Sequence, residues 1–255
     1  MYRRENVFLL VAILVAFVET VGPAVVAVAF AFRWRRERNP RAVGLIGFAL
    51  GGCLFLLSWI GKQLLLIAGL HDLLVDVSTF PRIVVSCLGA GLLAGLVEES
   101  IRFGAGAFLF RSARGLRPLR AAVCFGLGWG GMEAAITGLG ALFTVMDGLQ
   151  NPDAIAPPAW LPLVGLTERV SAIFLHVAFT AFAVLASRSK AGRAVAIFAA
   201  TAAAHAAIDA GVRALALRGL DGPNALLLEV YFAVCAAAVF AVASSVRAEA
   251  LSPSA

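Results

Sequence analysis

Seven long runs of apolar residues divide this chain and set the kind of fold that it can adopt. A helix that crosses a bilayer needs about 20 mostly apolar residues, and each run approaches or exceeds that length. Hydrophobic residues make up 61% of the sequence and charged residues 14%, too few to coat a soluble protein of 255 residues. We therefore expect an all-α fold, a polytopic transmembrane helical bundle. The expected spans are Val7–Phe32, Val43–Leu70, Ile83–Phe110, Ala121–Val145, Val170–Ala186, Ala194–Leu217 and Ala225–Val246.

We expect a single integral membrane domain over residues 1–255. About seven spans are predicted, with eight as the alternative, and the second is either one long helix or a shorter helix with an interfacial piece near Lys62. The longest connection, Met146–Arg169, contains four prolines and is predicted to form a lid or an interfacial segment. The cysteines fall within spans without paired spacing, which is typical of small core residues rather than of disulfides or a zinc cluster. They are Cys53, Cys87, Cys124 and Cys235.

Basic residues predict the orientation of the bundle. The segments RWRRERNPR, RSARGLRPLR and SRSKAGR connect the first span to the second, the third to the fourth and the fifth to the sixth, so all three share one side. Lys and Arg are retained on the cytoplasmic side during insertion, which puts the N-terminus outside and the C-terminus in the cytoplasm. On this map Arg169 lies in an outer loop. Topology and anionic lipid account for the net charge of +6 better than nucleic acid does. The preference for Arg over Lys, with abundant Ala, is typical of a GC-rich bacterial genome, and we expect a multi-pass protein of the bacterial cytoplasmic membrane.

A few ionisable residues interrupt the spans, where they are costly and usually face a protein or water-filled interior. Counted from the cytoplasmic end of each span, Glu98, Glu133, His176 and His205 lie at similar positions on four consecutive helices. At the rise of an α-helix this places all four about 16 to 18 Å above the inner boundary. We therefore predict one shared site inside the bilayer. Other ionisable residues of the spans are Glu19, Lys62, Glu99, Arg102, Asp209 and Glu229.

Local spacing adds supporting partners to this layer. Arg102 is four residues after Glu98 and three after Glu99, so its guanidinium can cover at least one of these carboxylates. Asp209 follows His205 by four residues, a spacing at which a carboxylate can fix the imidazole tautomer. The carboxylates outnumber Arg102, so protonation, an imidazolium or a divalent cation must reduce the excess. Glycine pairs Gly91/Gly95 and Gly126/Gly130 favour close helix packing.

The order of these motifs resembles that of the YhfC and PrsW families of intramembrane proteases, within the superfamily of CAAX prenyl proteases and bacteriocin-processing enzymes. The resemblance rests on EE-x-x-R, on aromatic-x-x-x-Glu, on a lone His and on His-x-x-x-Asp, and the motif-bearing core covers residues 83–217. One position departs from the YhfC pattern, because Trp129 stands where that family often has His. The residues concerned are Glu98, Glu99, Arg102, Trp129, Glu133, His176, His205 and Asp209.

The resemblance implies an intramembrane endopeptidase that cleaves a membrane-embedded or membrane-adjacent peptide or protein. Glu98 or Glu99 would activate water, with Glu98 favoured, while His176 and His205 would stabilise the oxyanion or bind a metal. The metal set would be Glu133, His176 and His205, with Zn²⁺ as the expected ion; metal-independent chemistry is the alternative. We expect the lipid bilayer and a peptide as partners, and no nucleic acid.

Other interpretations of the same residues stay open. Glu98 and Glu99 could form a buried ion pair with Arg102 that only orders the bundle, and Glu133 could be an interhelical hydrogen-bond partner. Asp209 could orient His205 or act directly. Glu19 could face the same cavity, while Lys62 and Glu229, nearer the outer side, could snorkel or pair. A proton-coupled transporter or a non-catalytic membrane adaptor or sensor are the alternative functions.

Overall fold

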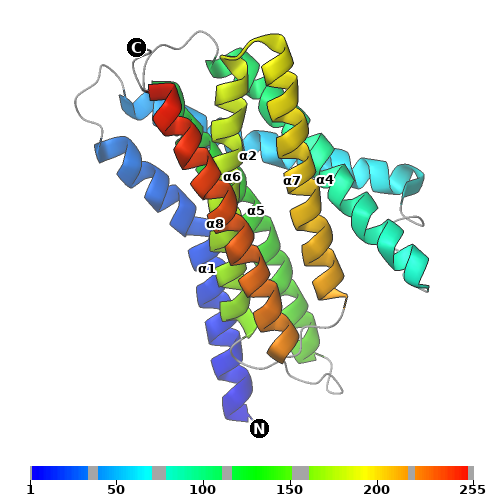
Figure 1. Cartoon of the computed structure of the whole chain (residues 1–255). Coiled ribbons are helices and arrows are strands. Elements are labelled where there is room, and N and C mark those ends of the chain that lie inside the picture. Colours follow the sequence, from blue (N-terminus) through cyan, green and yellow to red (C-terminus); the bar gives the residue numbers. More distant parts are fainter. Residues whose placement is uncertain are drawn as a thin grey trace.

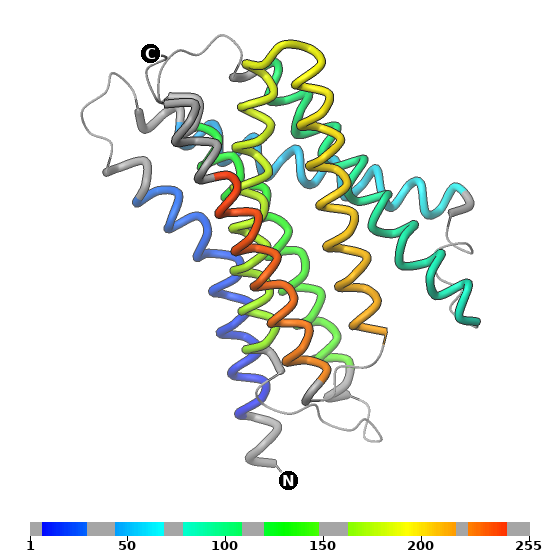
Figure 2. Tube along the Cα trace, in the orientation of Figure 1, coloured from blue at the N-terminus to red at the C-terminus, as the bar shows by residue number. Residues whose placement is uncertain are grey.

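The structure of the chain, a computed structural model, is built of long helices. It describes residues 2–33, 40–70, 79–110, 117–150, 161–217 and 222–251, and contains no strand within these ranges. Figure 1 shows the helices and Figure 2 the path of the chain through them. The elements are α1 (Tyr2–Arg33), α2 (Pro40–Leu65), the π-helix η1 (Leu66–Leu70), α4 (Phe80–Phe110), α5 (Arg117–Gln150), α6 (Leu161–Ser187), α7 (Ala191–Ala216) and α8 (Gly222–Leu251).

Seven of the described helices are long and apolar enough to cross a membrane, which confirms the predicted transmembrane helical bundle. The candidate spans agree with the expected ones to within a few residues at most ends. The fifth differs, because its candidate span begins at Leu163, seven residues before the expected Val170. Helix α6 therefore takes in Arg169, and the prediction that Arg169 lies in an outer loop is wrong.

The predicted lid is shorter than the sequence suggested. Helix α5 continues to Gln150 and α6 begins at Leu161, so both ends of the Met146–Arg169 connection are helical. The remaining residues, 151–160, lie outside the described part of the chain. The second span proves to be one α-helix to Leu65, followed by the π-helical turn of η1.

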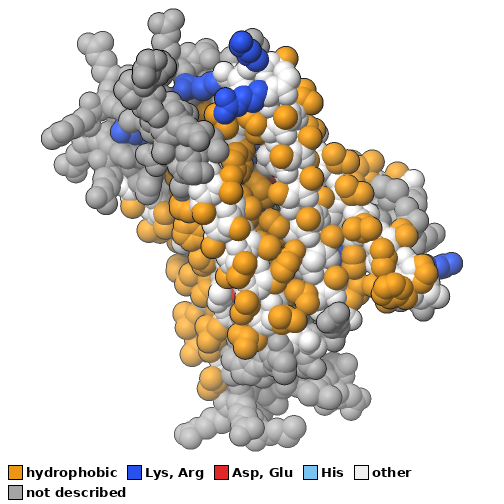
Figure 3. Space-filling model, viewed as in Figure 1, with side chains coloured by type: hydrophobic (Ala, Val, Ile, Leu, Met, Phe, Trp, Pro, Cys, Tyr) orange, Lys and Arg blue, Asp and Glu red, His pale blue; other side chains and the backbone are white. Residues whose placement is uncertain are grey.

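Helix α5 lies at the centre of the packing and contacts α1, α2 and α6, while α4 packs mainly on α7. Figure 1 shows α2 crossing the other helices at a steep angle, with the end of α2 and the start of α4 extending to one side. Figure 3 shows hydrophobic side chains covering the visible face, with Lys and Arg gathered at the end where α6 is joined to α7. A surface of this kind suits a lipid environment.

Close helix contacts depend on glycine, as the sequence predicted. A Cβ added at Gly95 of α4 would lie 2.5 Å from the backbone oxygen of Ala202 in α7. A Cβ added at Gly126 of α5 would lie 2.5 Å from the Cα of Val177 in α6. Only glycine allows the backbones to approach this closely, and the approach brings α4 to α7 and α5 to α6 at the level of the polar residues.

Candidate functional site

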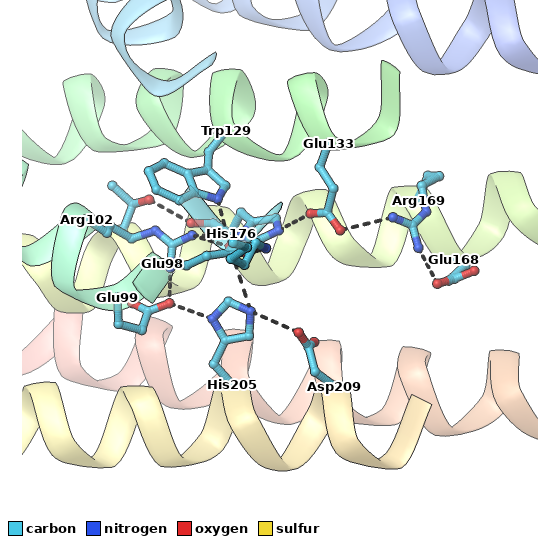
Figure 4. A network of polar contacts seen from close by, with 12 residues as sticks. Glu98, Glu99, Arg102, Trp129, Glu133, Glu168, Arg169, His176, His205 and Asp209 are labelled. Atoms are coloured by element: carbon cyan, nitrogen blue, oxygen red, sulfur yellow. Dashed lines mark hydrogen bonds and ion pairs between the residues drawn. The ribbon is translucent and has the colours of Figure 1, made fainter. Parts of the chain in front are cut away.

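A continuous network of polar side chains runs through the middle of the bundle. Figure 4 shows it extending from α4 and α5 across α6 to α7, and Lys62 of α2 joins it through Glu98. Most of its carboxylates and imidazoles contact a residue from another helix. The members are Lys62, Glu98, Glu99, Arg102, Trp129, Glu133, Glu168, Arg169, His176, His205 and Asp209.

Arg102 lies at the most deeply buried end of the network. Arg102 as a whole is 1% exposed, and its Nη1 pairs with Glu99 Oε1. Its Nη2 donates to His176 Nδ1 at 2.8 Å, and its Cζ lies 4.4 Å from the centroid of the Trp129 ring. Because guanidinium can only donate and carries a permanent charge, Arg102 holds Glu99 and His176 in place and is well suited to be a structural counter-ion.

Both carboxylate oxygens of Glu98 have partners. Oε1 pairs with Lys62 Nζ, and Oε2 accepts a hydrogen bond from Trp129 Nε1 at 3.1 Å. The indole can only donate, so it aims one oxygen of Glu98 in a fixed direction. The sequence marked Trp129 as a departure from a family pattern and not as a partner of Glu98; an aromatic side chain in an apolar helix gives no signal of such a contact.

His205 is held in one tautomer. Its Nδ1 lies 2.7 Å from Glu99 Oε1, and a carboxylate can only accept, so Nδ1 carries a proton. In the neutral imidazole Nε2 is then an acceptor. Nε2 lies 3.7 Å from Asp209 Oδ2 and 3.9 Å from Glu98 Oε2, while the ring stacks on Phe179 at 5.0 Å between centroids. The neutral ring would present the Nε2 electron pair to these two carboxylates, and the imidazolium would donate to them.

His176 is held in the opposite tautomer. Arg102 donates to its Nδ1, so in the neutral imidazole the proton is on Nε2. Nε2 contacts Glu133 Oε2, which accepts that proton in a hydrogen bond. The ring centroids of His176 and His205 are 5.9 Å apart. Two neighbouring histidines therefore offer different chemistry, one as a hydrogen-bond donor and the other as an acceptor or metal ligand.

Glu133 connects the histidine layer to a second arginine. Arg169 Nη1 donates to Glu133 Oε1 at 3.1 Å, and Nη2 pairs with Glu168 Oε1. Arg169 is 8% exposed, so it is a buried part of the network. Helix α6 can begin before its apolar run because the polar residue Arg169 forms ion pairs inside the bundle.

The added basic residues change the charge balance expected from sequence. With neutral histidines, the five carboxylates of the network face three basic side chains, those of Lys62, Arg102 and Arg169. Two formal negative charges remain uncompensated in a low-dielectric interior. Imidazolium formation, protonated carboxyls or one divalent cation would remove them.

Exposure divides the network into a buried and an accessible side. The side chains of Arg102 and Glu99 are 0% exposed and that of Glu98 is 4% exposed. Lys62, Glu133 and Asp209 are 17%, 26% and 36% exposed. The accessible members of the network are therefore Lys62, Glu133, Glu168 and Asp209, and three of them contact buried residues: Lys62 contacts Glu98, Glu133 contacts His176 and Asp209 lies beside His205.

The donor atoms around His205 match zinc in chemical type, a neutral imidazole nitrogen with carboxylates. Tetrahedral zinc holds neighbouring ligand atoms about 3.3 Å apart, a little closer than Nε2 of His205 is to its two carboxylates. The Nδ1 contact with Glu99 is the outer bond typical of zinc-bound histidines. Within the described ranges no group of three or more His, Cys, Asp or Glu side chains is already arranged around one metal position. The nitrogen and oxygen donors are thus of the types that zinc binds. Their distances from one another are those of ion pairs rather than of ligands around one ion.

The structure brings all seven predicted site residues into this one network. Glu19 and Glu229 are buried, and both interact electrostatically with Arg169 and Glu168 at the edge of the network. Both oxygens of Glu229 lack a hydrogen-bond partner. Sequence reasoning missed Lys62, Arg169 and Trp129 as members. For Lys62 the signal was present, since an ammonium inside a span needs a carboxylate partner.

Comparison with known families supports the same region. The sequence model of one family, described as the YhfC intramembrane metalloprotease, matches residues 24–232. The matched range takes in most of the chain and every member of the polar network. No curated protein and no solved structure matches the chain.

Proposed function

The chain belongs to the YhfC intramembrane metalloprotease family, and from this premise we propose that it is an endopeptidase acting on membrane-embedded or membrane-adjacent peptides. One observation carries the proposal beyond the family name. A buried carboxylate, Glu98, lies beside the acceptor nitrogen of His205 and just behind the accessible side of the network. Such a group can take a proton from water where the bilayer excludes bulk solvent.

Glu98 suits the role of general base better than Glu99 does. The Oε1 atom of Glu99 is shared between Arg102 and His205, and its side chain is fully buried. Glu98 borders Lys62 and the acceptor side of His205, closer to the exposed carboxylates. Glu99 is therefore a positioning residue, which fixes the His205 tautomer.

The reaction proceeds in two steps. Glu98 takes a proton from water as the water oxygen bonds to the scissile carbonyl carbon, and the carbonyl oxygen becomes an oxyanion. The C–N bond then breaks, and the leaving amine takes the proton that Glu98 carries. The Nε2 proton of His176 is available as a hydrogen-bond donor to the oxyanion once Glu133 releases it.

A zinc ion would be held by His205 Nε2 with the carboxylate of Asp209, which leaves Glu98 beside them as base. When bound, it would polarise the carbonyl as a Lewis acid and make water easier to deprotonate. The opposite tautomers favour His205 over His176 as the nitrogen ligand, because His176 Nδ1 already accepts from Arg102. Of the ligand set predicted from sequence, Glu133, His176 and His205, this proposal keeps His205, because the carboxylate of Glu133 contacts His176 and Arg169. The full set stays a prediction.

The test uses purified full-length protein in liposomes with a panel of quenched transmembrane peptides. Glu98→Gln is expected to lower kcat by about 10³-fold or more, while Glu99→Gln and His205→Ala each lower it by about 10²-fold. Glu229→Gln is the matched control, since this buried carboxyl has no hydrogen-bond partner and its electrostatic neighbours are Glu168 and Arg169 rather than Glu98 or His205. Unchanged cleavage in all three network variants would reject the assignment.

A chain of carboxylates and imidazoles also resembles a proton relay, so the same liposomes should be loaded with a pH-sensitive dye. If the protein is a protease, the liposomes should show peptide cleavage without net proton flux across the membrane. Proton flux that depends on Glu98, with no peptide cleaved by the wild-type protein, would favour the transporter instead.

A further inference from the structure

Lys62 adds a positive charge to the site. It belongs to none of the family motifs, and it contacts Glu98 rather than either histidine. It comes from the last turn of α2, just before the π-helix η1, and its Nζ pairs with Glu98 Oε1. The aromatic ring of Phe55, which lies two turns earlier on the same helix, is centred 5.7 Å from Nζ. π-Helical turns frequently occur at functional sites, where they redirect the residues beside them.

The other two basic side chains of the network are poorly placed to reach a substrate. Arg102 is fully buried between Glu99, His176 and Trp129. Arg169 is shared between Glu133 and Glu168. Neither can leave its partners without exposing a bare charge in the bundle.

Lys62 is placed differently. Its side chain is 17% exposed, and its electrostatic neighbours are Glu98, Glu133 and Asp209. Glu133 and Asp209 are the most exposed carboxylates of the network, so Lys62 shares the accessible side with them. A lysine carries three donors on a flexible stem, so it can keep one hydrogen bond to Glu98 and offer another to a substrate.

We propose that Lys62 is a further catalytic residue, whose ammonium donates a hydrogen bond to the scissile carbonyl oxygen as negative charge develops there. This inference rests on the proposed protease function. No bond to Lys62 forms or breaks, and the ammonium keeps its proton throughout. The same contact explains why a cation is held beside the general base. One N–H of the Lys62 ammonium orients Glu98, and the remaining N–H groups stabilise the oxyanion that Glu98 helps to create.

The first test compares cleavage by three variants in liposomes. Lys62→Met is expected to lower kcat by about 10² to 10³-fold with KM changed less than about threefold, because the interaction strengthens only in the transition state. Lys62→Arg, which keeps a cation and its donors, should recover to within about tenfold of wild type. Gln63→Met, the neighbouring change on the same helix, is the matched control and should leave kcat unchanged.

The second test separates contact with substrate from an effect exerted through Glu98. In a Glu98→Gln background, the binding of a transmembrane peptide is compared with that of its phosphonamidate analogue, an anionic mimic of the tetrahedral intermediate. Adding Lys62→Met should weaken the analogue by about 10²-fold and the peptide by less than about threefold. Equal loss for both ligands, or cleavage by Lys62→Met within threefold of wild type, would overturn the role of Lys62. Wild-type protein that cleaves no peptide and binds no analogue would instead overturn the proposed function itself.

Discussion

The two ends of the polar network are built from similar residues and differ in what surrounds them. At one end Arg102 pairs with Glu99, and both side chains are 0% exposed. The guanidinium of Arg102 lies near the rings of Trp129 and Phe179. At the other end Lys62, Glu133 and Asp209 are 17%, 26% and 36% exposed. The arginine end can hold other residues in position, while the exposed end can meet water and substrate.

This difference suggests a division of labour between support and chemistry. A charge buried with its partner contributes little net stability, yet removing one member leaves the other bare and is costly. A charge at the accessible end can be rehydrated, so its loss should affect the reaction more than the fold. Substitutions at the two ends should therefore separate stability from activity.

The largest expected effect comes from the buried end. Arg102→Met should lower the free energy of unfolding by about 3 to 5 kcal/mol, since Glu99 loses its ionic partner, and should abolish cleavage. Unfolding in detergent micelles measures the first and the peptide assay the second. Arg213→Met is the comparison variant, because the hydrogen bonds described for Arg213 go to the hydroxyl of Ser86, at 2.8 and 3.0 Å. It should cost about 1.5 kcal/mol and spare activity; equal losses for the two variants would contradict the distinction.

The accessible end should respond in the opposite way. Asp209→Asn keeps the size of the side chain but removes a charge near His205 Nε2, so kcat should fall by about 10 to 100-fold. The free energy of unfolding should change by less than about 0.5 kcal/mol, because Asp209 is the most exposed member of the network. A loss of stability without a loss of activity would place Asp209 with the supporting residues.

The two histidines sharpen the comparison further. Nitrogen NMR of labelled protein should show the proton of neutral His205 on Nδ1 and that of neutral His176 on Nε2. Added Zn²⁺ should shift the Nε2 resonance of His205 and leave that of His176 nearly unchanged. In equilibrium dialysis, His205→Gln should lower zinc affinity by more than about 100-fold and His176→Gln by less than about tenfold. Equal effects would restore the two-histidine ligand set.

The span pattern and the common level of the site residues in the bundle could be predicted from sequence for a simple reason. Helices that run nearly side by side have the same rise per residue, so distance from a basic loop gives depth directly. This holds for the helices that carry Glu98, Glu133, His176 and His205, and the structure brings these four together. Local spacing likewise predicted the Arg102 and Asp209 contacts.

The contacts between distant helices could not be predicted in this way. Helix α2 crosses the others at a steep angle in Figure 1, so counting residues along it does not give the depth of Lys62. The ammonium was expected nearer the outer side, yet it contacts Glu98. Arg169 was assigned to a loop because polar residues end an apolar run, and only the partner on α5 reveals that the helix begins earlier.

The smallest effect is expected at Glu229, a buried carboxyl that interacts with Glu168 and Arg169 only through the electrostatic field and forms no hydrogen bond. It is 8% exposed, and neither of its oxygens has a hydrogen-bond partner. An unsatisfied buried polar group is destabilising, so Glu229→Met should raise the free energy of unfolding by about 1 kcal/mol and leave cleavage unchanged. Unfolding and peptide assays on the same preparation would measure both. A fall in activity would show that the working part of the network extends to α8, and exposure alone would then not separate the residues that support the site from those that act in it.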